Sequence, residues 1–330
     1  MPVNGAYAFT ELSDYEASIE EAKIELVVTG GGQFKAKLTR ADLGQLHLLR
    51  SREDLASIAY LGLRADLVFV TFPTRFNPAP VWAGQELRPG DVVFHGRQDH
   101  IHMRTAGSSE KGFIALKPEH LAFWSKTLTD TEAAPPTFAR IIQPSRSVWR
   151  RLLHLHAGAC RLVEDSPEVI AHPEVARALE HDLIHALITC LAPDARPQAR
   201  SIRARRAAVM NRFEDMLAAQ PGRHLHMPEL CEAVGVCERT LRLCCAEFVG
   251  MSPRQYLRLR QLKMVRTELQ KADPATTSVA AAARKYGFGE LGRFAGMYRT
   301  VYGEMPSATL QLRHRQPVGR SSSEGNVSKA

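Results

Sequence analysis

Short runs of apolar residues alternate with turn residues over the first third of the chain. Runs rich in Val and Phe occupy positions 67–73, 91–96 and 111–118, and Pro or Gly residues separate them. Runs of this kind, bounded by turn residues, are typical of β-strands. Several short strands at this spacing predict a β-barrel or a sandwich between about residues 25 and 120.

The apolar pattern changes to a helical period after Gln143. Positions 145–164 carry apolar residues three or four apart, and positions 173–192 repeat this pattern. We expect two helices that pack as a hairpin on the barrel or against a second subunit. The proline- and arginine-rich stretch that follows predicts a linker over residues 193–202.

The fold class that these patterns predict is multidomain α+β. An N-terminal β-barrel with a helical hairpin is expected over residues 1–192, and an all-α domain over residues 203–312. The remainder, residues 313–330, is polar and rich in Gly and Ser, so we expect a disordered tail.

The helical C-terminal region contains an internal repeat. Gly235 and Val236 align with Gly287 and Phe288 at an offset of 52 residues. At an offset of 53, Leu241, Cys245, Gly250 and Pro253 align with Phe294, Tyr298, Gly303 and Pro306. The slip of one residue falls in a turn, where an insertion is tolerated best. Two units of one design therefore follow each other in the chain.

Each unit has the pattern of a helix-turn-helix. In the first, a short helix over residues 228–234 ends at Gly235, which can adopt the left-handed conformation that closes a helix. In the second, Ser278 can cap the first helix and Gly287 ends it. The units are predicted at about 228–247 and 279–300. The apolar stripe of residues 253–271 predicts a long connecting helix between them.

This doubled pattern resembles the DNA-binding domain of the AraC/XylS family of bacterial transcription regulators. The residues that carry the resemblance are Leu230, Gly235, Val236, Arg239, Thr240, Leu241, Gly250, Met251, Ser252, Pro253, Tyr256, Leu257, Tyr286, Gly287, Phe288, Phe294, Tyr298, Gly303 and Pro306. The resemblance implies a cupin-like N-terminal domain for effector binding and dimerisation. It also implies two recognition helices that enter successive major grooves on one face of DNA.

The resemblance places the base-facing positions on the second helix of each unit. These positions are Arg239, Arg242 and Leu243 in the first unit and Leu291, Gly292, Arg293 and Gly296 in the second. The fork of an Arg side chain matches two acceptors on guanine. Leu243 and Gly296 stand where the family often has Arg, so we expect a modest intrinsic affinity that dimerisation increases. Arg254, Arg258, Arg260 and Arg266 are candidates for phosphate contacts or for helix surface.

The charge distribution favours an anionic partner. The net charge is +8, and positions 196–315 carry 21 Lys and Arg against 10 Asp and Glu. A basic module on a near-neutral body suggests nucleic acid as the partner.

Four of the six cysteines lie between positions 231 and 245. Cys231 is expected where the two helices approach and need a small side chain, because Ala283 holds that place in the second unit. Cys244 and Cys245 are expected in the core, and Cys237 at the N-cap of the recognition helix, where it caps weakly. A metal or redox site is the less favoured alternative, since the chain lacks a Cys-x-x-Cys motif.

The barrel suggests a pocket for a small molecule. Candidates for its wall are Phe69, Phe72, Trp82 and Phe94, and His100, His102 and Arg104 could supply polar groups at its mouth for a carboxylate-bearing metabolite. Residues two apart on a strand share a face, so His100 and His102 could also bind one metal ion. The carboxylate and the later His of a metal cupin are not well placed, which disfavours this enzyme alternative.

We therefore expect a sequence-specific transcription regulator that responds to an effector and needs no metal or cofactor. Its expected partners are double-stranded DNA, a small-molecule effector, RNA polymerase if it activates, and a second copy of the chain. No catalytic triad or phosphate-binding glycine loop is visible, and no apolar run or leader pattern suggests a membrane, so we expect a cytoplasmic non-enzyme. Two alternatives stay open: a metal-dependent cupin enzyme fused to a DNA-binding domain, and a constitutive DNA-binding protein whose barrel only dimerises.

Overall fold

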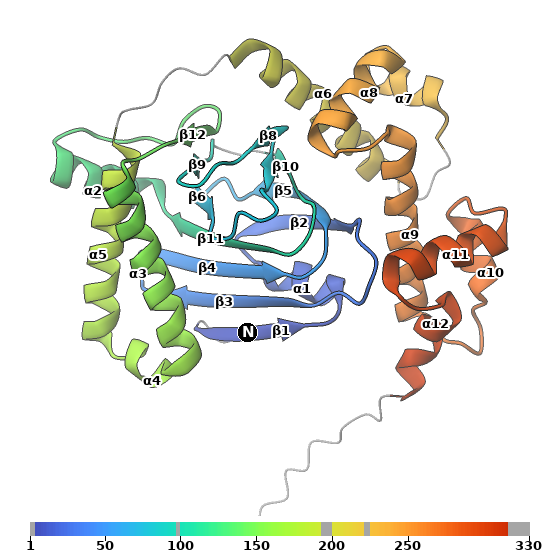
Figure 1. Ribbon diagram of the computed structural model, residues 1–330, viewed down its shortest axis with the longest axis horizontal. Helices are drawn as coiled ribbons and strands as arrows, with labels where there is room; N and C mark the ends of the chain where they lie inside the picture. Colours follow the sequence, from blue (N-terminus) through green and yellow to red (C-terminus); the bar gives the residue numbers. More distant parts are fainter. Residues whose placement is uncertain (1–3, 97–99, 193–199, 221–224, 316–330) are drawn as a thin grey trace, which may run out of the picture.

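The computed structural model describes residues 4–96, 100–192, 200–220 and 225–315. Antiparallel strands dominate the N-terminal part, and the rest is helical (Figure 1). The strands are β1 (Gly5–Phe9), β2 (Ala22–Val28), β3 (Ala36–Asp42), β4 (Leu46–Glu53), β5 (Ser57–Leu63), β6 (Val68–Pro73), β7 (Val81–Trp82), β8 (Gln85–Glu86), β9 (Val92–Phe94), β10 (His100–Thr105), β11 (Ser109–Leu116) and β12 (Arg140–Ile142). The helices among them are α1 (Leu12–Ser18) and α2 (Pro118–Thr129).

The strands form two sheets with a shared core. The seven-stranded sheet has the order β1-β3-β4-β11-β6-β9-β12, and the five-stranded sheet has the order β2-β5-β10-β7-β8. Side chains of both sheets meet in one cluster that includes Leu26, Leu38, Leu49, Leu61 and Met103. The Val- and Phe-rich runs of the sequence lie in β6, β9 and β11. The barrel-like β domain expected from the sequence is confirmed.

A helical hairpin covers the outer face of the seven-stranded sheet (Figure 1). It consists of α3 (Arg146–Asp165) and α5 (Pro173–Leu191), with the short α4 (Pro167–Ile170) between them. Its core joins Leu152 and Leu187 to Val70 and Ile114 of the sheet. These helices occupy the segments where the helical period appears in the sequence, and they pack on the barrel of their own chain.

The C-terminal domain contains two helix-turn-helix units joined by one long helix. The first consists of α6 (Arg200–Ala219), α7 (Met227–Val234) and α8 (Glu238–Phe248). The connecting helix is α9 (Pro253–Lys271), and the second unit consists of α10 (Val279–Lys285), α11 (Leu291–Tyr302) and α12 (Pro306–Arg315). Each unit has its own buried cluster, and α9 contributes Tyr256 to the first and Leu262, Val265 and Leu269 to the second.

Local signals in the sequence explain the helix ends of both units. Gly235 ends α7 in the left-handed conformation at φ 72°, and Gly287 has φ 83° after α10. The hydroxyl of Ser278 accepts a hydrogen bond of 3.1 Å from the amide of Ala281, which caps α10. Ser252 and Gln255 form a capping box at the start of α9.

Some segment expectations differ from the structure or lie outside it. Helix α6 already includes residues 200–202, which the sequence suggested as linker, and α12 runs to Arg315 into the expected tail. The rest of the linker, residues 193–199, and the tail from 316 onward lie outside the described residues. None of the described helices is long and apolar enough to cross a bilayer.

Candidate nucleic-acid interface

The recognition helix of the first unit, α8, has one buried and one exposed face. Leu241, Cys244, Cys245 and Phe248 point into the core. Arg239, Arg242 and Leu243 are exposed, and they line an open hollow of about 500 Å³ together with Glu238 and Ala246. The side chain of Leu243 is half exposed. The three base-facing residues predicted in this unit thus share one solvent-facing surface.

The recognition helix of the second unit, α11, repeats this division. Phe294, Tyr298, Val301 and Tyr302 are buried, whereas Gly292, Arg293 and Gly296 are exposed and Leu291 is half-buried. The side chain of Arg293 is 82% exposed. A Cβ atom at Gly292 or Gly296 would have no neighbour within 4 Å, so this part of the helix surface is flat and open.

In both units a glutamate near the start of the recognition helix pairs with the exposed arginine. Nε of Arg242 lies 2.8 Å from Oε1 of Glu238. Nε of Arg293 lies 3.0 Å from Oε2 of Glu290. Exposed pairs of this kind contribute little stability, so they can rearrange when another acceptor approaches.

The four arginines suggested as phosphate contacts have different positions. Arg254 is exposed at the start of α9. The guanidinium of Arg258 lies 4.4 Å from the ring centroid of Phe288 and donates to the carbonyl of Gly287 at 3.2 Å, so it ties α9 to the second unit.

Arg260 and Arg266 differ from the expectation of phosphate contacts or helix surface. Both side chains are held in the interface with the N-terminal domain. Arg260 pairs with Glu214, and its Nη2 lies 2.6 Å from Oε1 of Glu25. Arg266 pairs with Glu304 at 2.6 Å and approaches Glu11 at 3.4 Å. With both guanidinium groups engaged by carboxylates, they are not available to DNA phosphates in this arrangement.

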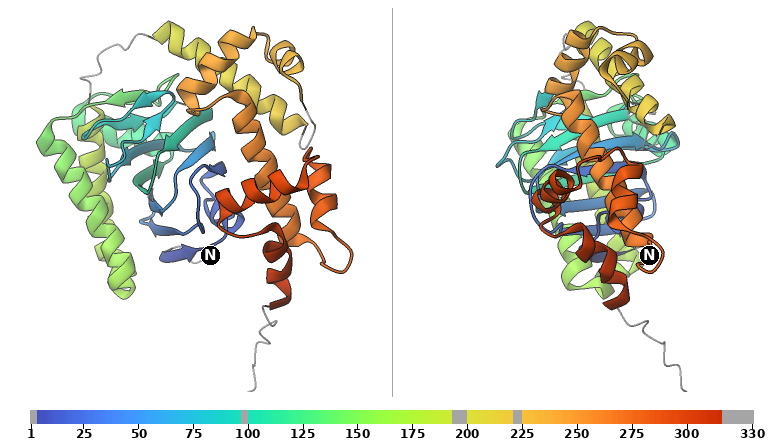
Figure 2. Two further views of the ribbon diagram at one scale, coloured as in Figure 1. Left: turned by 45° about the vertical axis from the view of Figure 1, so that its right-hand side comes forward. Right: turned by 90° about the vertical axis from the view of Figure 1, so that its right-hand side faces the viewer.

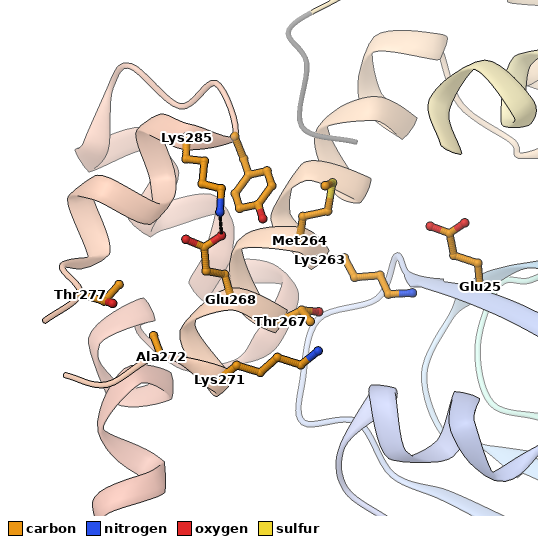
Figure 3. A pocket seen from close by; sticks show the side chains of 10 residues that line it. Glu25, Lys263, Met264, Thr267, Glu268, Lys271, Ala272, Thr277 and Lys285 are labelled. Carbon is orange, nitrogen blue, oxygen red and sulfur yellow. Dashed lines mark hydrogen bonds and ion pairs between the residues drawn. The ribbon is translucent and has the colours of Figure 1, made fainter. Parts of the chain in front are cut away.

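A row of basic residues on α9 meets a row of acidic residues on the N-terminal domain. Besides the two arginines, Nζ of Lys263 lies 2.5 Å from Oε1 of Glu16, and Gln270 donates to Glu11. Burial raises the pKa of Glu16, although the nearby Lys263 opposes the shift. A groove of about 550 Å³ opens beside this row, between β2 and helices α9 and α10 (Figure 3).

The centre of the interface is a buried carboxylate, that of Glu214 on α6. It accepts hydrogen bonds from Tyr256 at 2.7 Å and pairs with Arg260, and it lies 2.8 Å from Nε2 of His102. Burial raises the pKa of Glu214, but the hydrogen bond with His102 and the charge of Arg260 outweigh it, and the pKa lies below its usual value. The sequence pattern did not single out Glu214, Glu11, Glu16 or Glu25.

The mouth residues proposed for an effector pocket lie on the opposite face of their strand. His100, His102 and Arg104 alternate on β10, and they face outward, toward the helical domain or solvent. Ile101 and Met103, which alternate with them, are buried in the barrel clusters. Within the described ranges, no three His, Cys, Asp or Glu residues are grouped to hold a metal ion.

Most of the proposed wall residues do not line the space between the sheets either. Phe94 belongs to the core under the helical hairpin, where Phe72 packs 5.4 Å from Trp149 between ring centroids. Trp82 packs with Leu87, Val93 and Ile101. Only Phe69 of the proposed wall lines the space between the sheets. The period of the strands predicts which residues share a face, but not which face turns inward.

A small cavity of about 40 Å³ lies between the two sheets. Most of its lining is apolar, and it includes Leu26, Ala59 and Met103 of the five-stranded sheet. Two buried polar atoms of lining residues have no hydrogen-bond partner, Oγ of Ser51 and Nδ1 of His95. Burial lowers the pKa of His95 to about 3, so its ring is neutral.

The cysteines lie where the repeat predicts them. Cys244 and Cys245 are buried, and burial raises the pKa of both thiols. Cys237 is the N-cap of α8 but accepts no capping hydrogen bond, and its Sγ lies 3.2 Å from Oγ1 of Thr240. Cys231 is half-buried on α7. All six thiols are free.

The geometry defines the C-terminal region as a tandem helix-turn-helix DNA-binding domain. Residues 230–312 match the family model described as "Helix-turn-helix domain". This part of the chain is an AraC/XylS-type domain, and the resemblance stated from the sequence is confirmed for it.

Curated relatives support this assignment. The protein named "Probable thc operon regulatory protein" from Rhodococcus erythropolis is 29% identical over 178 residues, which are 54% of this chain and 53% of that protein. The "XylDLEGF operon transcriptional activator 2" of Pseudomonas putida is 37% identical over 90 residues, 27% of this chain and 57% of that protein. The chain thus spans about half the length of these two relatives.

Among solved structures, the chain is similar to the AraC-like transcriptional activator CuxR. The match has a TM-score of 0.40 and 14% sequence identity, and it covers 80% of this chain and 95% of that one.

Proposed function

We propose that the chain is a sequence-specific transcription regulator that binds two successive major grooves of DNA, and not an enzyme. The observation that carries the proposal is the pair of recognition helices α8 and α11, whose solvent-facing sides expose Arg239 and Arg242 on α8 and Arg293 on α11. Two relatives of the chain are named as regulators of operons.

In this proposal the base contacts come from both helices. Arg239 and Arg242 on α8 and Arg293 on α11 donate to guanine acceptors in the major groove. Leu243 gives an apolar contact, which suits a thymine methyl group. Leu291, Gly292 and Gly296 let α11 approach the base edges closely. Arg254 contacts a phosphate. Other exposed basic side chains of this domain also interact with the DNA backbone.

Selection of binding sites tests this function. The intact chain is incubated with a random DNA library, and the bound duplexes are sequenced after several rounds. We expect an enriched motif of two short elements about one helical turn apart, and binding that weakens steeply with salt. No enrichment over the starting library, at any salt concentration, would refute sequence-specific binding.

We further propose that the N-terminal domain senses a small, mainly apolar molecule that widens the cavity between the two sheets when it binds, because about 40 Å³ is too small for such a molecule as it stands. The apolar lining and the unpartnered atoms of Ser51 and His95 support this proposal. A ligand can alter DNA binding only if it favours one arrangement of the protein over another. The inner face of the five-stranded sheet lines the cavity, while its outer face contacts the DNA-binding domain.

A pair of volume-increasing variants tests the sensing proposal. A reporter is placed behind the selected DNA motif, and growth conditions that change its output are identified for the intact chain. Ala59→Val narrows the cavity, whereas Ala41→Val adds the same group to the core under the helical hairpin. We expect only Ala59→Val to weaken the response. An equal response in both variants would contradict sensing at this site.

A further inference from the structure

The five-stranded sheet and the loops at its two edges contact both helix-turn-helix units. The second unit lies near the β2 edge, and the first unit extends from β2 across to the turn between β7 and β8. Strand β2 forms one edge of this sheet, and strands β7 and β8 form the other. The DNA-binding domain lies along this side of the barrel (Figures 1 and 2). The loop after β2 reaches the end of α11, and the turn between β7 and β8 reaches the end of α8.

At the β2 edge, Gly31 and Gly32 pack against the end of the second recognition helix. A Cβ atom at Gly31 would lie only 2.5 Å from the carbonyl oxygen of Thr300. A Cβ atom at Gly303, directly after α11, would lie 3.4 Å from the backbone of Gly32. Glycine is therefore needed for this close approach of two backbones. The ion pairs of Glu16 and Glu25 with α9 hold the same edge.

At the opposite edge, the contacts involve the end of the first recognition helix. Gly84 has φ 76°, and a Cβ atom there would lie 2.6 Å from Cγ of Glu247 on α8. Next to it, Gln85 accepts a hydrogen bond from Arg203 of α6. The guanidinium of Arg104 lies under Gly250, where a Cβ atom would come within 3.0 Å of Nη1.

Between these two edges the interface is continuous. Val27 of β2 and Ile58 of β5 are part of the buried cluster of the first unit. His102 of β10 reaches Glu214. Neighbouring strands lie about 4.8 Å apart, so the four intervals from β2 to β8 span roughly 19 Å of rigid, hydrogen-bonded sheet.

We propose that the five-stranded sheet is a brace that sets the separation and rotation of the two recognition helices, and thereby makes the intact chain specific for the spacing between the two halves of its DNA site. The inference rests on the proposed function, because both units must bind DNA. Without the sheet, the two units are joined through α9, which contributes side chains to both clusters. A second, rigid connection removes the bending and twisting freedom that one helix leaves.

DNA spacing is a sensitive measure of such a brace. One added base pair moves the second half-site by about 3.4 Å and rotates it by about 35° around the helix axis, as 10–10.5 base pairs make one turn. Two recognition helices held at a fixed separation and rotation cannot adjust to this change. Two recognition helices joined flexibly can adjust to it in part.

The experiment measures the affinity of the intact chain for its selected site and for duplexes with one base pair added or removed between the halves. For the unaltered protein we expect a loss of about tenfold or more on the altered spacings, comparable with a mismatched base pair. Gly31→Ala forces the loop away from α11. Glu16→Lys/Glu25→Lys places like charges against Lys263 and Arg260. Both variants should reduce the loss to about threefold or less.

Several controls make the outcome decisive. Gly158→Ala lies on α3, where the nearest atom to the new Cβ is the Arg161 guanidinium at 4.0 Å, and it should behave as the unaltered protein. Hydrogen exchange of α9 reports whether the interface has opened. Added lysines raise the affinity for every duplex, so we compare the ratio of affinities for two spacings, which this general gain leaves unchanged. If Gly31→Ala fails to fold, the same affinities are measured with Glu16→Lys/Glu25→Lys, and that result decides.

If the folded variants lose as much affinity on the altered spacings as the unaltered protein does, the brace is refuted. The preference for one spacing would then come from α9. Absence of any sequence-specific binding by the unaltered chain would instead refute the proposed function, so the two failures are distinguishable.

Discussion

Nε2 of His102 lies 2.8 Å from Oε1 of Glu214, and the two residues belong to different domains. Each is only 1% exposed. His102 is on β10 of the barrel, and Glu214 is on α6 of the DNA-binding domain. Glu214 also accepts a hydrogen bond from Tyr256 and forms an ion pair with Arg260. One carboxylate therefore joins the barrel, the first unit and the connecting helix.

Removal of this carboxylate should be costly. Glu214→Ala leaves Arg260 in a mostly buried place with Glu25 as its remaining ion-pair partner, and we expect a loss of about 3–5 kcal/mol in the free energy of unfolding. Urea denaturation of the intact protein measures it, with Glu232→Ala on the exposed face of α7 as the control. A loss below about 1 kcal/mol would show that the network contributes little.

The stability of the protein should fall as the pH drops below about 6.5. Burial lowers the pKa of His95 to about 3 and that of His156 to about 4, so both are neutral in the folded protein and gain protons on unfolding. Their contribution is complete above pH 6.5 and is lost as pH falls, by about 1.4 kcal/mol per pH unit for each.

Urea unfolding at pH 8 and pH 5 measures this slope. His95→Phe should make it shallower, because it removes one of the two groups that gain a proton on unfolding. Equal slopes in His95→Phe and the unaltered protein would mean that His95 is already protonated or accessible in the folded state.

The cysteines of the first unit should be replaceable. Cys231→Ala should be nearly neutral, because Ala283 fills the equivalent place in the second unit. Cys237→Ser should stabilise the protein by about 0.5–1 kcal/mol, because a hydroxyl at the N-cap can accept the amide hydrogen bond that the thiol does not accept. Thermal unfolding measures both. Loss of DNA binding in both, together with loss of a stoichiometric metal, would support a metal site instead.

Release of Arg242 should increase the affinity for DNA. Glu238→Gln removes the partner of Arg242 and a negative charge from the DNA-facing surface. We expect a gain of a few-fold on specific and unrelated DNA alike. Glu168→Gln on the distant α4 is the matched control. A loss confined to the specific site would show that Glu238 itself accepts a hydrogen bond from a base, as Glu does with cytosine.

The tandem units could be predicted from the sequence because their signals are local. Gly235, Ser278 and Gly287 mark helix ends through their own backbone conformation or side chain. Leu241 and Phe294 repeat a core position at a fixed distance from those ends. The exposed positions of Arg239 and Arg293 follow from the same helical period.

The interface between the domains could not be predicted in this way. Glu25 and Arg260 are 235 positions apart, and no local pattern marks them as partners. From the sequence alone, Arg260 is therefore indistinguishable from the other basic residues on a DNA-binding helix. Likewise, the period of β10 places His102 and Arg104 on one face, but only packing against α6 and α8 determines that this face lies outside the barrel.

Base recognition by Arg239 and Arg293 is the central element of the proposed function. Equilibrium binding of Arg239→Ala and Arg293→Ala to the selected site and to an unrelated duplex, at one salt concentration, tests it. We predict that each change costs about 1–3 kcal/mol on the selected site and almost nothing on the unrelated duplex. Equal losses on the two duplexes, or no loss on either, would contradict base recognition by these two helices.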